Sequence, residues 1–368
     1  MSSQIKRNIG DKLDPRVAVV ALFVGVMEYE VFTISKGVIS IAGHDAWLSF
    51  LIGGLMAAFF MYLMVKLASR FPKENLFQYN RKVWGKFIAF IIAVSYILYW
   101  LFYLTILISD TAYANKQFFL PKTPSIVPMT LLVAGAAWMA LYGLTALIRS
   151  FQIMFVFILV PLLMIPLFAF TNMEYNNFLP VVKNGMLPVI KGALHFAGAL
   201  QGLELILFLS PFLTNARKAL KPALVGVLLI AAVNSVLVLV VIGVLGEINA
   251  GYSVYPLYDS ITLIELPGFP VERFELFLTF PWIVGIFTTL CLFVYLASYG
   301  IVQVFGLQRK FVVFAVTVFV IAAAYIFPDF AVVEKARGLL PYLTIIFMYI
   351  MPVLTLLVAI IRLKRDNA

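Results

Sequence analysis

The sequence predicts an all-α integral membrane protein with about ten transmembrane helices and both termini in the cytoplasm. Of its 368 residues, 63% are hydrophobic and only 12% are charged, and the mean hydropathy is +1.03. A soluble domain carries roughly a quarter charged residues, so this composition cannot supply a water-soluble surface. The apolar runs are continuous and about 20 residues long or longer, the length that a helix needs to cross the hydrocarbon core. Outer-membrane barrels are excluded, because their strands alternate apolar and polar residues.

Ten apolar runs follow one another along the chain. The spans are expected at 17–42, 46–69, 87–109, 126–148, 150–171, 189–213, 219–246, 276–304, 311–328 and 339–361. No cleaved signal peptide is expected, because the first run is too long for the apolar segment of such a peptide and no small-residue cleavage site follows it.

The placement of Lys and Arg gives the orientation. With the N-terminus inside, most of the 27 basic residues fall in cytoplasmic segments, while most acidic residues fall outside. A missed or extra helix would scramble this alternation, so the pattern favours ten spans. The net charge of +10 is therefore assigned to cytoplasmic loops at the lipid bilayer, and no nucleic-acid partner is expected.

Two clusters of polar and small residues lie at membrane depth, one in span one and one in span six. Ionisable side chains there are costly and need an interior partner or a water-filled cavity. The runs GVMEYEVFTISKGV and HFAGALQGLELILF supply the candidate ligand-binding residues Gly25, Glu28, Tyr29, Glu30, Gly198, Gln201, Gly202 and Glu204.

The two clusters occupy matching places if the chain is a 5+5 inverted repeat. We expect a single transmembrane domain, 1–368, with repeat one at about 15–171 and repeat two at about 185–363. Discontinuous helices at matching places in two halves indicate a transporter-type binding site, because a broken helix frees backbone groups that can bind a ligand. We therefore expect spans one and six to be broken, with 199–203 unwound.

Alternative interpretations of the two clusters stay open. Gly198 and Gly202 also suit close helix packing. Glu28 and Glu30 would point to nearly opposite sides of a regular helix, so unwinding would let both reach one cavity. A buried structural pair between Glu28 and Lys36 is the competing hypothesis.

Weaker candidates lie elsewhere in the membrane. Thr288 in span eight could line the cavity or form an interhelical hydrogen bond, while Asn234 and Ser235 in span seven favour the second role. The aromatic residues of span three, Tyr96 to Tyr103, are expected to pack.

Two connecting segments also differ from plain loops. The basic, aromatic segment 71–85 either lies on the cytoplasmic leaflet or is solvated. The segment 247–275 predicts an external lid with a short helix near 261–266, or a passive loop.

Enzyme functions are disfavoured. The chain has two histidines and one cysteine, which offers no metal constellation. It contains neither a nucleophile elbow nor a phosphate-binding loop. No catalytic residue, metal or other cofactor is expected.

Several stretches carry a resemblance to a known family. They are AGHDAWLSFLIGG (42–54), FLPVVKNGMLPVIKGA (178–193), GLELILFLSPFL (202–213) and, most specific, FPVERFELFLTFPWIVGIFTT (269–289). With its length and ten spans, the chain resembles the spore germination permease family, the integral B subunits of the Ger germinant receptors, within the amino acid–polyamine–organocation superfamily.

The resemblance implies an inverted-repeat fold in which helices one and six are unwound and a small germinant, typically an amino acid, binds between them. It also implies partnership with an A-type subunit and a lipoprotein C-type subunit in the spore inner membrane. We expect a permease subunit that binds a small polar ligand at mid-membrane and signals germination. The alternatives are an autonomous proton- or cation-coupled amino-acid or amine symporter, with Glu28, Glu30 or Glu204 as proton site, and a purely structural assembly subunit.

One departure from the family pattern shapes the expected ligand. Family members commonly carry small residues at the break of helix one, where this chain has Glu28, Tyr29 and Glu30. Carboxylates there would repel the carboxylate of a bound amino acid. We therefore expect either proton sensitivity or a preference for ligands with an amine and no free carboxylate.

Overall fold

The structure is a computed structural model that describes residues 12–27, 30–264, 275–326 and 330–362, and these residues form helices and connecting turns. The longer helices are α2 (Val17–Val26), α3 (Glu30–Ala42), α4 (Ala46–Arg70), α6 (Lys86–Ala114), α7 (Ile126–Tyr142), α8 (Leu144–Ala169), α9 (Met186–Gly198), α11 (Leu220–Tyr252), α13 (Glu275–Phe305), α14 (Arg309–Ile326) and α17 (Met351–Arg362). The shorter ones are α5 (Leu76–Trp84), α10 (Leu205–Leu209), α12 (Pro256–Thr262), α15 (Phe330–Arg337) and α16 (Leu340–Thr344).

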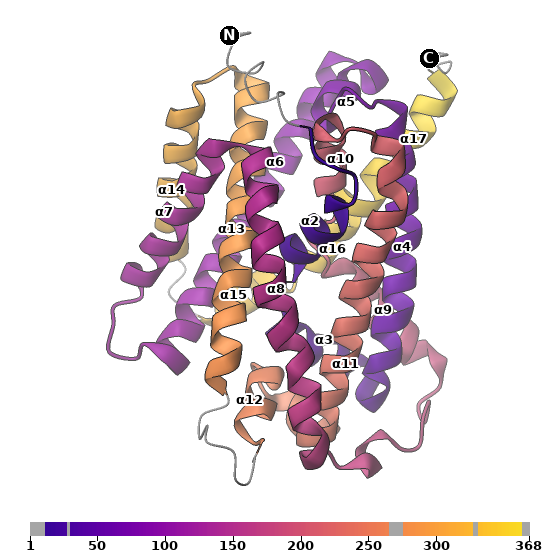
Figure 1. Cartoon of the computed structure of the whole chain (residues 1–368), viewed down its shortest axis with the longest axis vertical. Coiled ribbons are helices and arrows are strands. Elements are labelled where there is room, and N and C mark those ends of the chain that lie inside the picture. The colour runs from indigo at the N-terminus through magenta and orange to yellow at the C-terminus, as the bar shows by residue number, and fades with distance from the viewer. Residues whose placement is uncertain (1–11, 28–29, 265–274, 327–329, 363–368) are drawn as a thin grey trace.

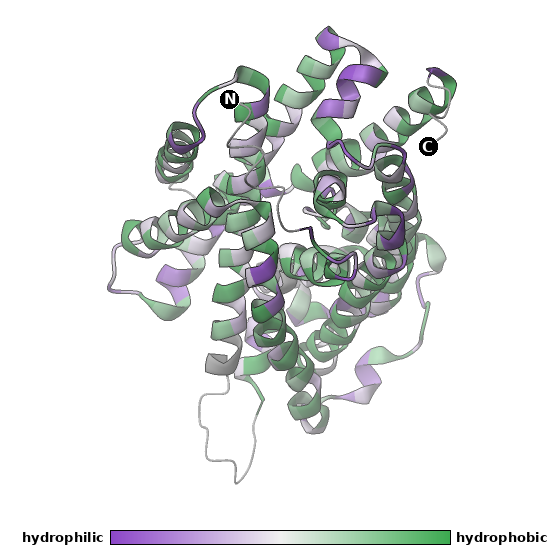
Figure 2. Cartoon of the chain, turned by 45° about the horizontal axis from the view of Figure 1, so that its top comes forward, coloured by the Kyte–Doolittle hydropathy of each residue, from purple (hydrophilic) through white to green (hydrophobic). Residues whose placement is uncertain are grey.

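Helix length and hydropathy make this a multi-pass membrane protein. Among the described residues, six helical stretches are long and apolar enough to cross a bilayer, at 33–70, 86–119, 144–172, 216–252, 280–305 and 331–362. Two shorter apolar helices, α2 and α7, accompany them. Figure 2 shows apolar residues along the long helices and hydrophilic residues mainly in the connections and at helix ends. The all-helical membrane fold is confirmed, while the number of ten crossings stays a prediction.

The predicted interruptions of spans one and six are present. Span one consists of α2 and α3, and α2 ends at Val26, because the backbone of the next residue, Met27, leaves the helical region (φ −78°, ψ 76°). Span six consists of α9 and α10, separated by the non-helical turns of residues 199–204. Within this segment Gly202 has φ +105°, a left-handed conformation that an L side chain rarely adopts.

Two predicted boundaries were wrong. The break between spans four and five falls at Gly143 (φ 95°) rather than near 149, because glycine alone takes this conformation without strain. The short helix expected near 261–266 is α12, which begins five residues earlier at Pro256. Proline suits the first position of a helix, where its missing N–H is not needed. Residues 265 and 266 lie outside the described part of the chain.

The helices pack in two groups. Helices α3, α9 and α11 pack around α4, and α2 packs against α11, whereas α6, α7, α13 and α14 form the second set of neighbours. In terms of spans, the first group holds one, two, six and seven, and the second holds three, four, eight and nine. Each group thus combines spans that hold the same place in the first and the second half of the chain, while the bounds of the two repeats stay a prediction.

The ends of the molecule differ in character. In Figure 1, α5 and the end of α17 lie at the top and α12 lies at the bottom. Helix α5 is stabilised by a capping box in which the Asn75 side chain accepts from the Gln78 backbone N–H and the Gln78 side chain accepts from that of Asn75. It buries Leu76, Phe77 and Val83 and exposes Arg81. The segment 71–85 is therefore a docked amphipathic helix and not a plain solvated loop.

Candidate functional site

The C-terminal end of α2 leaves carbonyl groups without helical partners, and α13 supplies donors to them. Thr288 Oγ1 lies 3.1 Å from the Val24 carbonyl oxygen and 2.7 Å from that of Gly285 in its own helix. Thr289 Oγ1 donates to the Gly25 carbonyl at 3.4 Å. The last carbonyls of a helix have no partner within the helix, so these hydroxyls stabilise the interruption. Thr288 therefore makes the interhelical bond that was one of its two predicted roles.

The two broken helices meet through glycine. A Cβ built on Gly202 would lie 3.0 Å from the Gly25 carbonyl oxygen and 3.3 Å from a methyl carbon of Val26. Gly198, the last residue of α9, is equally constrained, since a Cβ there would lie 2.8 Å from the Pro341 carbonyl oxygen. Both sequence hypotheses thus hold, because Gly198 allows close packing and Gly202 allows unwinding.

Glu204 fixes the unwound segment from inside. Its side chain is fully buried, and its Oε1 accepts from the indole N–H of Trp100 at 3.0 Å. Its Oε2 accepts from the backbone N–H of Gly202 at 2.9 Å. The carboxylate thereby takes the place of a carbonyl acceptor that a continuous helix would provide. Trp100 was expected only to pack, although a Trp at mid-span needs a partner for its N–H.

Gln201 is a polar side chain at this junction with unused hydrogen-bonding capacity. It is 1% exposed, and its amide nitrogen donates to the Gly198 carbonyl at 3.3 Å. Its Oε1 has no hydrogen-bond partner among the described residues. A buried amide oxygen without a partner costs free energy, so it is suited to accept from a bound molecule. The neighbouring Ala197 carbonyl is already used by the Tyr349 hydroxyl at 2.7 Å.

The acidic residues predicted in span one cannot be placed in this site. Glu28 and Tyr29 lie outside the described residues, and Glu30 is described only as the backbone start of α3. Lys36, the predicted partner of Glu28, pairs with Glu334 of α15 at 3.0 Å. The roles of Glu28, Tyr29 and Glu30 therefore remain predictions.

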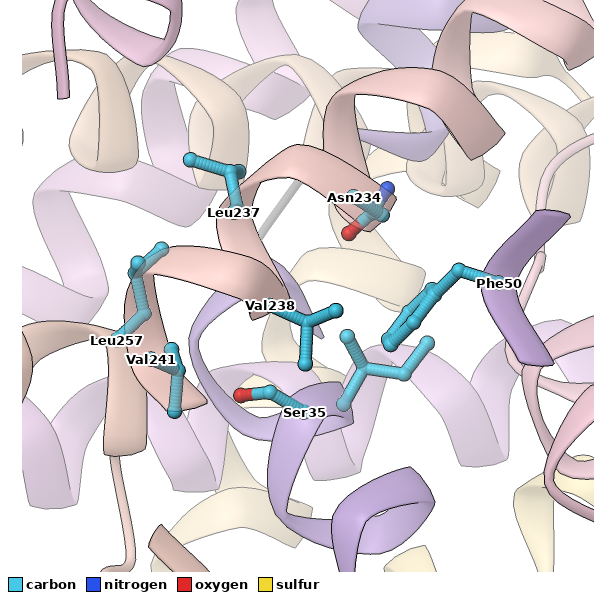
Figure 3. Close-up of a pocket in the computed structure, with 8 residues that line it drawn as sticks. Ser35, Phe50, Asn234, Leu237, Val238, Val241 and Leu257 are labelled. Atoms are coloured by element: carbon cyan, nitrogen blue, oxygen red, sulfur yellow. The ribbon is translucent and has the colours of Figure 1, made fainter. Parts of the chain in front are cut away.

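A narrow cavity, too small to hold a water-sized sphere, lies between α3, α4, α11 and α12 (Figure 3). It is lined by Ile34, Ser35, Phe50, Asn234, Leu237, Val238, Val241 and Leu257. None of the predicted ligand-binding residues lines it. The Ser35 hydroxyl is buried there without a hydrogen-bond partner among the described residues. Asn234 joins the cavity to the junction, because its Nδ2 lies 3.3 Å from the Met27 sulfur at the end of α2.

Solved structures show which class of membrane protein has this fold. The chain is similar to MHP1, a nucleobase-cation-symport-1 family transporter, with a TM-score of 0.64 and 15% identity over 92% of this chain and 78% of that one. It is also similar to MhsT in complex with L-phenylalanine, with a TM-score of 0.64 and 10% identity over 95% and 90% of the two chains. The fold is therefore one that membrane transporters share.

Sequence comparison narrows the class to a family. The model of the spore germination protein family, a family of permeases, matches residues 12–331. Spore germination protein YndE of Bacillus subtilis is 30% identical over 266 residues, 71% of this chain and 72% of its own. Spore germination protein A2 of the same organism is 27% identical over 323 residues, 87% of each chain. This chain belongs to the spore germination permease family, and the resemblance expected from its motifs is confirmed.

Proposed function

We propose that the chain is the permease subunit of a germinant receptor. It binds a small polar ligand where the breaks of spans one and six meet, and it passes a conformational signal to A-type and lipoprotein C-type partner subunits. We place it in the spore inner membrane with both termini in the cytoplasm, in line with the placement of Lys and Arg. The observation that carries the proposal is the contact of Gly202 with the Gly25 carbonyl, which couples two interrupted helices at one point.

The electrostatics of the junction favour an amine as the ligand. Helices α2 and α9 both end there, and the C-terminal end of a helix carries partial negative charge. The N-terminal end of α10, which carries partial positive charge, already has the buried Glu204 as its N-cap residue. The backbone N–H of Gly202, which could have bound a ligand carboxylate, is taken by Glu204. The Gln201 Oε1 adds a further acceptor. A protonated amine meets acceptors at this place, whereas a carboxylate finds its donor occupied.

The test uses spores in which this chain, with its two partner subunits, is the only receptor. Paired probes differ in the carboxylate alone, such as L-alanine against ethylamine and L-valine against isobutylamine. Germination is followed by release of dipicolinic acid. A response to the amine at equal or lower concentration than to the amino acid supports the proposal. A response to amino acids alone would overturn the amine preference, and no response to any pair would overturn the receptor assignment for this class of ligand.

The second candidate is an autonomous proton-coupled symporter, for which the buried carboxylate of Glu204 is the supporting observation. Proteoliposomes containing the purified chain separate the two functions. Accumulation of labelled alanine or ethylamine driven by a proton gradient, lost in Glu204→Gln, would favour the symporter. Binding without accumulation favours the receptor.

A further inference from the structure

His44 lies in a buried polar cluster at the end of the molecule opposite α5. It belongs to a single helical turn, η1 (Gly43–Asp45), between α3 and α4, and it is 5% exposed. Its Nδ1 lies 3.0 Å from Glu247 Oε2, and its Nε2 lies 2.9 Å from the Pro180 carbonyl oxygen. An ionised carboxylate and a carbonyl can only accept, and a neutral imidazole carries a single N–H. Both hydrogen bonds therefore form together only when His44 is the doubly protonated imidazolium.

The cluster joins three segments that are distant in sequence. Glu247 follows Gly246, whose φ of 74° kinks α11, and it also accepts from the His44 backbone N–H at 3.3 Å. Asp45 accepts from the Val182 backbone N–H at 2.9 Å. The turn between spans one and two is thus tied to span seven and to the segment before α9. A Cβ at the preceding residue, Gly43 (φ 63°), would lie 2.7 Å from Glu247 Oε1 and would force the carboxylate to move.

The charges around His44 favour its protonated form. Asp45 Oδ2 lies 3.5 Å from Nε2 on the same turn, and Glu247 approaches from α11. The segment before α9 adds the Pro180 carbonyl and the exposed Lys183, and Lys36 on α3 is paired with Glu334. The adjoining turn η4 (Tyr175–Phe178) brings only the exposed Tyr175.

The surroundings of His44 act on its pKa in both directions. Burial lowers the pKa of His44, but the hydrogen bonds to Glu247 and Pro180 and the charges of Asp45 and Glu247 together raise it above the ordinary 6.5. A raised folded-state pKa means that the contact is fully formed below pH 6.5 and is lost as the pH rises through the raised value.

We propose that His44, Asp45, Glu247 and the Pro180 carbonyl form a proton-controlled clasp that holds the ends of spans one, two and seven to the segment before α9. When the proton leaves, the imidazole keeps one N–H and releases either Glu247 or Pro180. The released turn directly follows α3, the half-helix that leads to the break of span one. The clasp thereby makes movement of α3 depend on pH. Its consequence for germinant response rests on the proposed function, whereas its existence does not.

The first measurement is a histidine NMR titration of the purified full chain. The chain has two histidines, His44 and His195, so selective ¹³C-histidine labelling gives two signals, and His44→Gln assigns them. We expect the His44 signal to titrate above 6.5 and Glu247→Gln to move its midpoint to lower pH. A His44 midpoint at or below 6.5, or one unchanged by Glu247→Gln, would overturn the proposal.

The second measurement is hydrogen exchange of the peptide that contains 180–184, corrected for intrinsic rates. We expect protection at about pH 5.5 to fall roughly tenfold by about pH 9, the change appropriate to one lost charge-assisted hydrogen bond. His44→Gln should remove this pH dependence and His195→Gln should retain it. Protection that is equally pH-dependent in His44→Gln and wild type would contradict the clasp. Neither measurement uses a germinant, so the clasp can fail or stand independently of the receptor function.

Discussion

Gly202→Ala is the substitution that tests the junction of the two broken helices most sharply. Gly202 has a left-handed backbone (φ +105°). A Cβ built there would lie 3.0 Å from the Gly25 carbonyl oxygen, which cannot easily move because it belongs to the backbone. A left-handed conformation costs an L side chain about 1–2 kcal/mol. Forcing a methyl group into a filled space typically costs about 1–3 kcal/mol more. We expect a combined loss of roughly 2–5 kcal/mol of stability.

The matched control is Gly85→Ala. Gly85 has a similar positive φ of 80°, but a Cβ there would meet no atom within 4 Å. With ψ 171°, Gly85 lies in a backbone region that glycine alone adopts readily, so Gly85→Ala should lose only the backbone contribution, about 1–3 kcal/mol. Thermal denaturation of both variants in the same detergent, followed by fluorescence-detected gel filtration, gives the comparison. Gly202→Ala should be clearly the less stable protein and should not respond to germinant. Equal losses in the two variants would refute a tight contact between the breaks.

Three further substitutions test two contacts at the junction and the cap of α5, each by the same denaturation measurement. Trp100→Phe removes a donor to the buried Glu204 carboxylate and should cost about 1–3 kcal/mol; an unchanged midpoint would show that this bond does not hold the turn. Thr288→Val leaves the Val24 carbonyl without this donor and should cost about 0.5–1.5 kcal/mol, and wild-type stability would argue against stabilisation of the break by α13. Asn75→Ala removes the cap of α5 and should cost about 0.5–2 kcal/mol of stability. Wild-type stability of this variant would mean that α5 does not unfold together with the rest of the protein.

The sequence predicted the breaks because their cause is local. Gly202 and Glu204 lie in an apolar run where a carboxylate is costly, and that cost alone indicates an irregular, polar place in the helix. The position in the sixth of ten runs, matching the cluster in the first, then predicted which helices meet. The glycines left packing and unwinding open, since the same residue type serves both.

Other parts of the site depend on tertiary contacts that no local pattern encodes. Glu204 is bound by Trp100 on α6, and the Gly25 carbonyl is bound by Thr289 on α13. Nothing in the spacing of these residues in the sequence indicates either pairing. The contacts of His44 could not be predicted, because its partners Pro180 and Glu247 are more than a hundred residues away in the sequence. The cavity at Ser35 was missed for the same reason.

The central claim is that a small ligand binds where the breaks of spans one and six meet, and Gln201→Leu tests it most directly. The substitution removes the unpartnered amide oxygen while keeping a side chain of similar size. Gln152→Leu, at an exposed position on α8, is the matched control. In spores with this chain as the only permease subunit, the concentration of the active amine or amino acid giving half-maximal germination should rise about tenfold or more for Gln201→Leu, the loss expected for a hydrogen bond to a charged group. It should not change for Gln152→Leu. An unchanged value for Gln201→Leu, with the protein present at wild-type level, would contradict a ligand site at the junction.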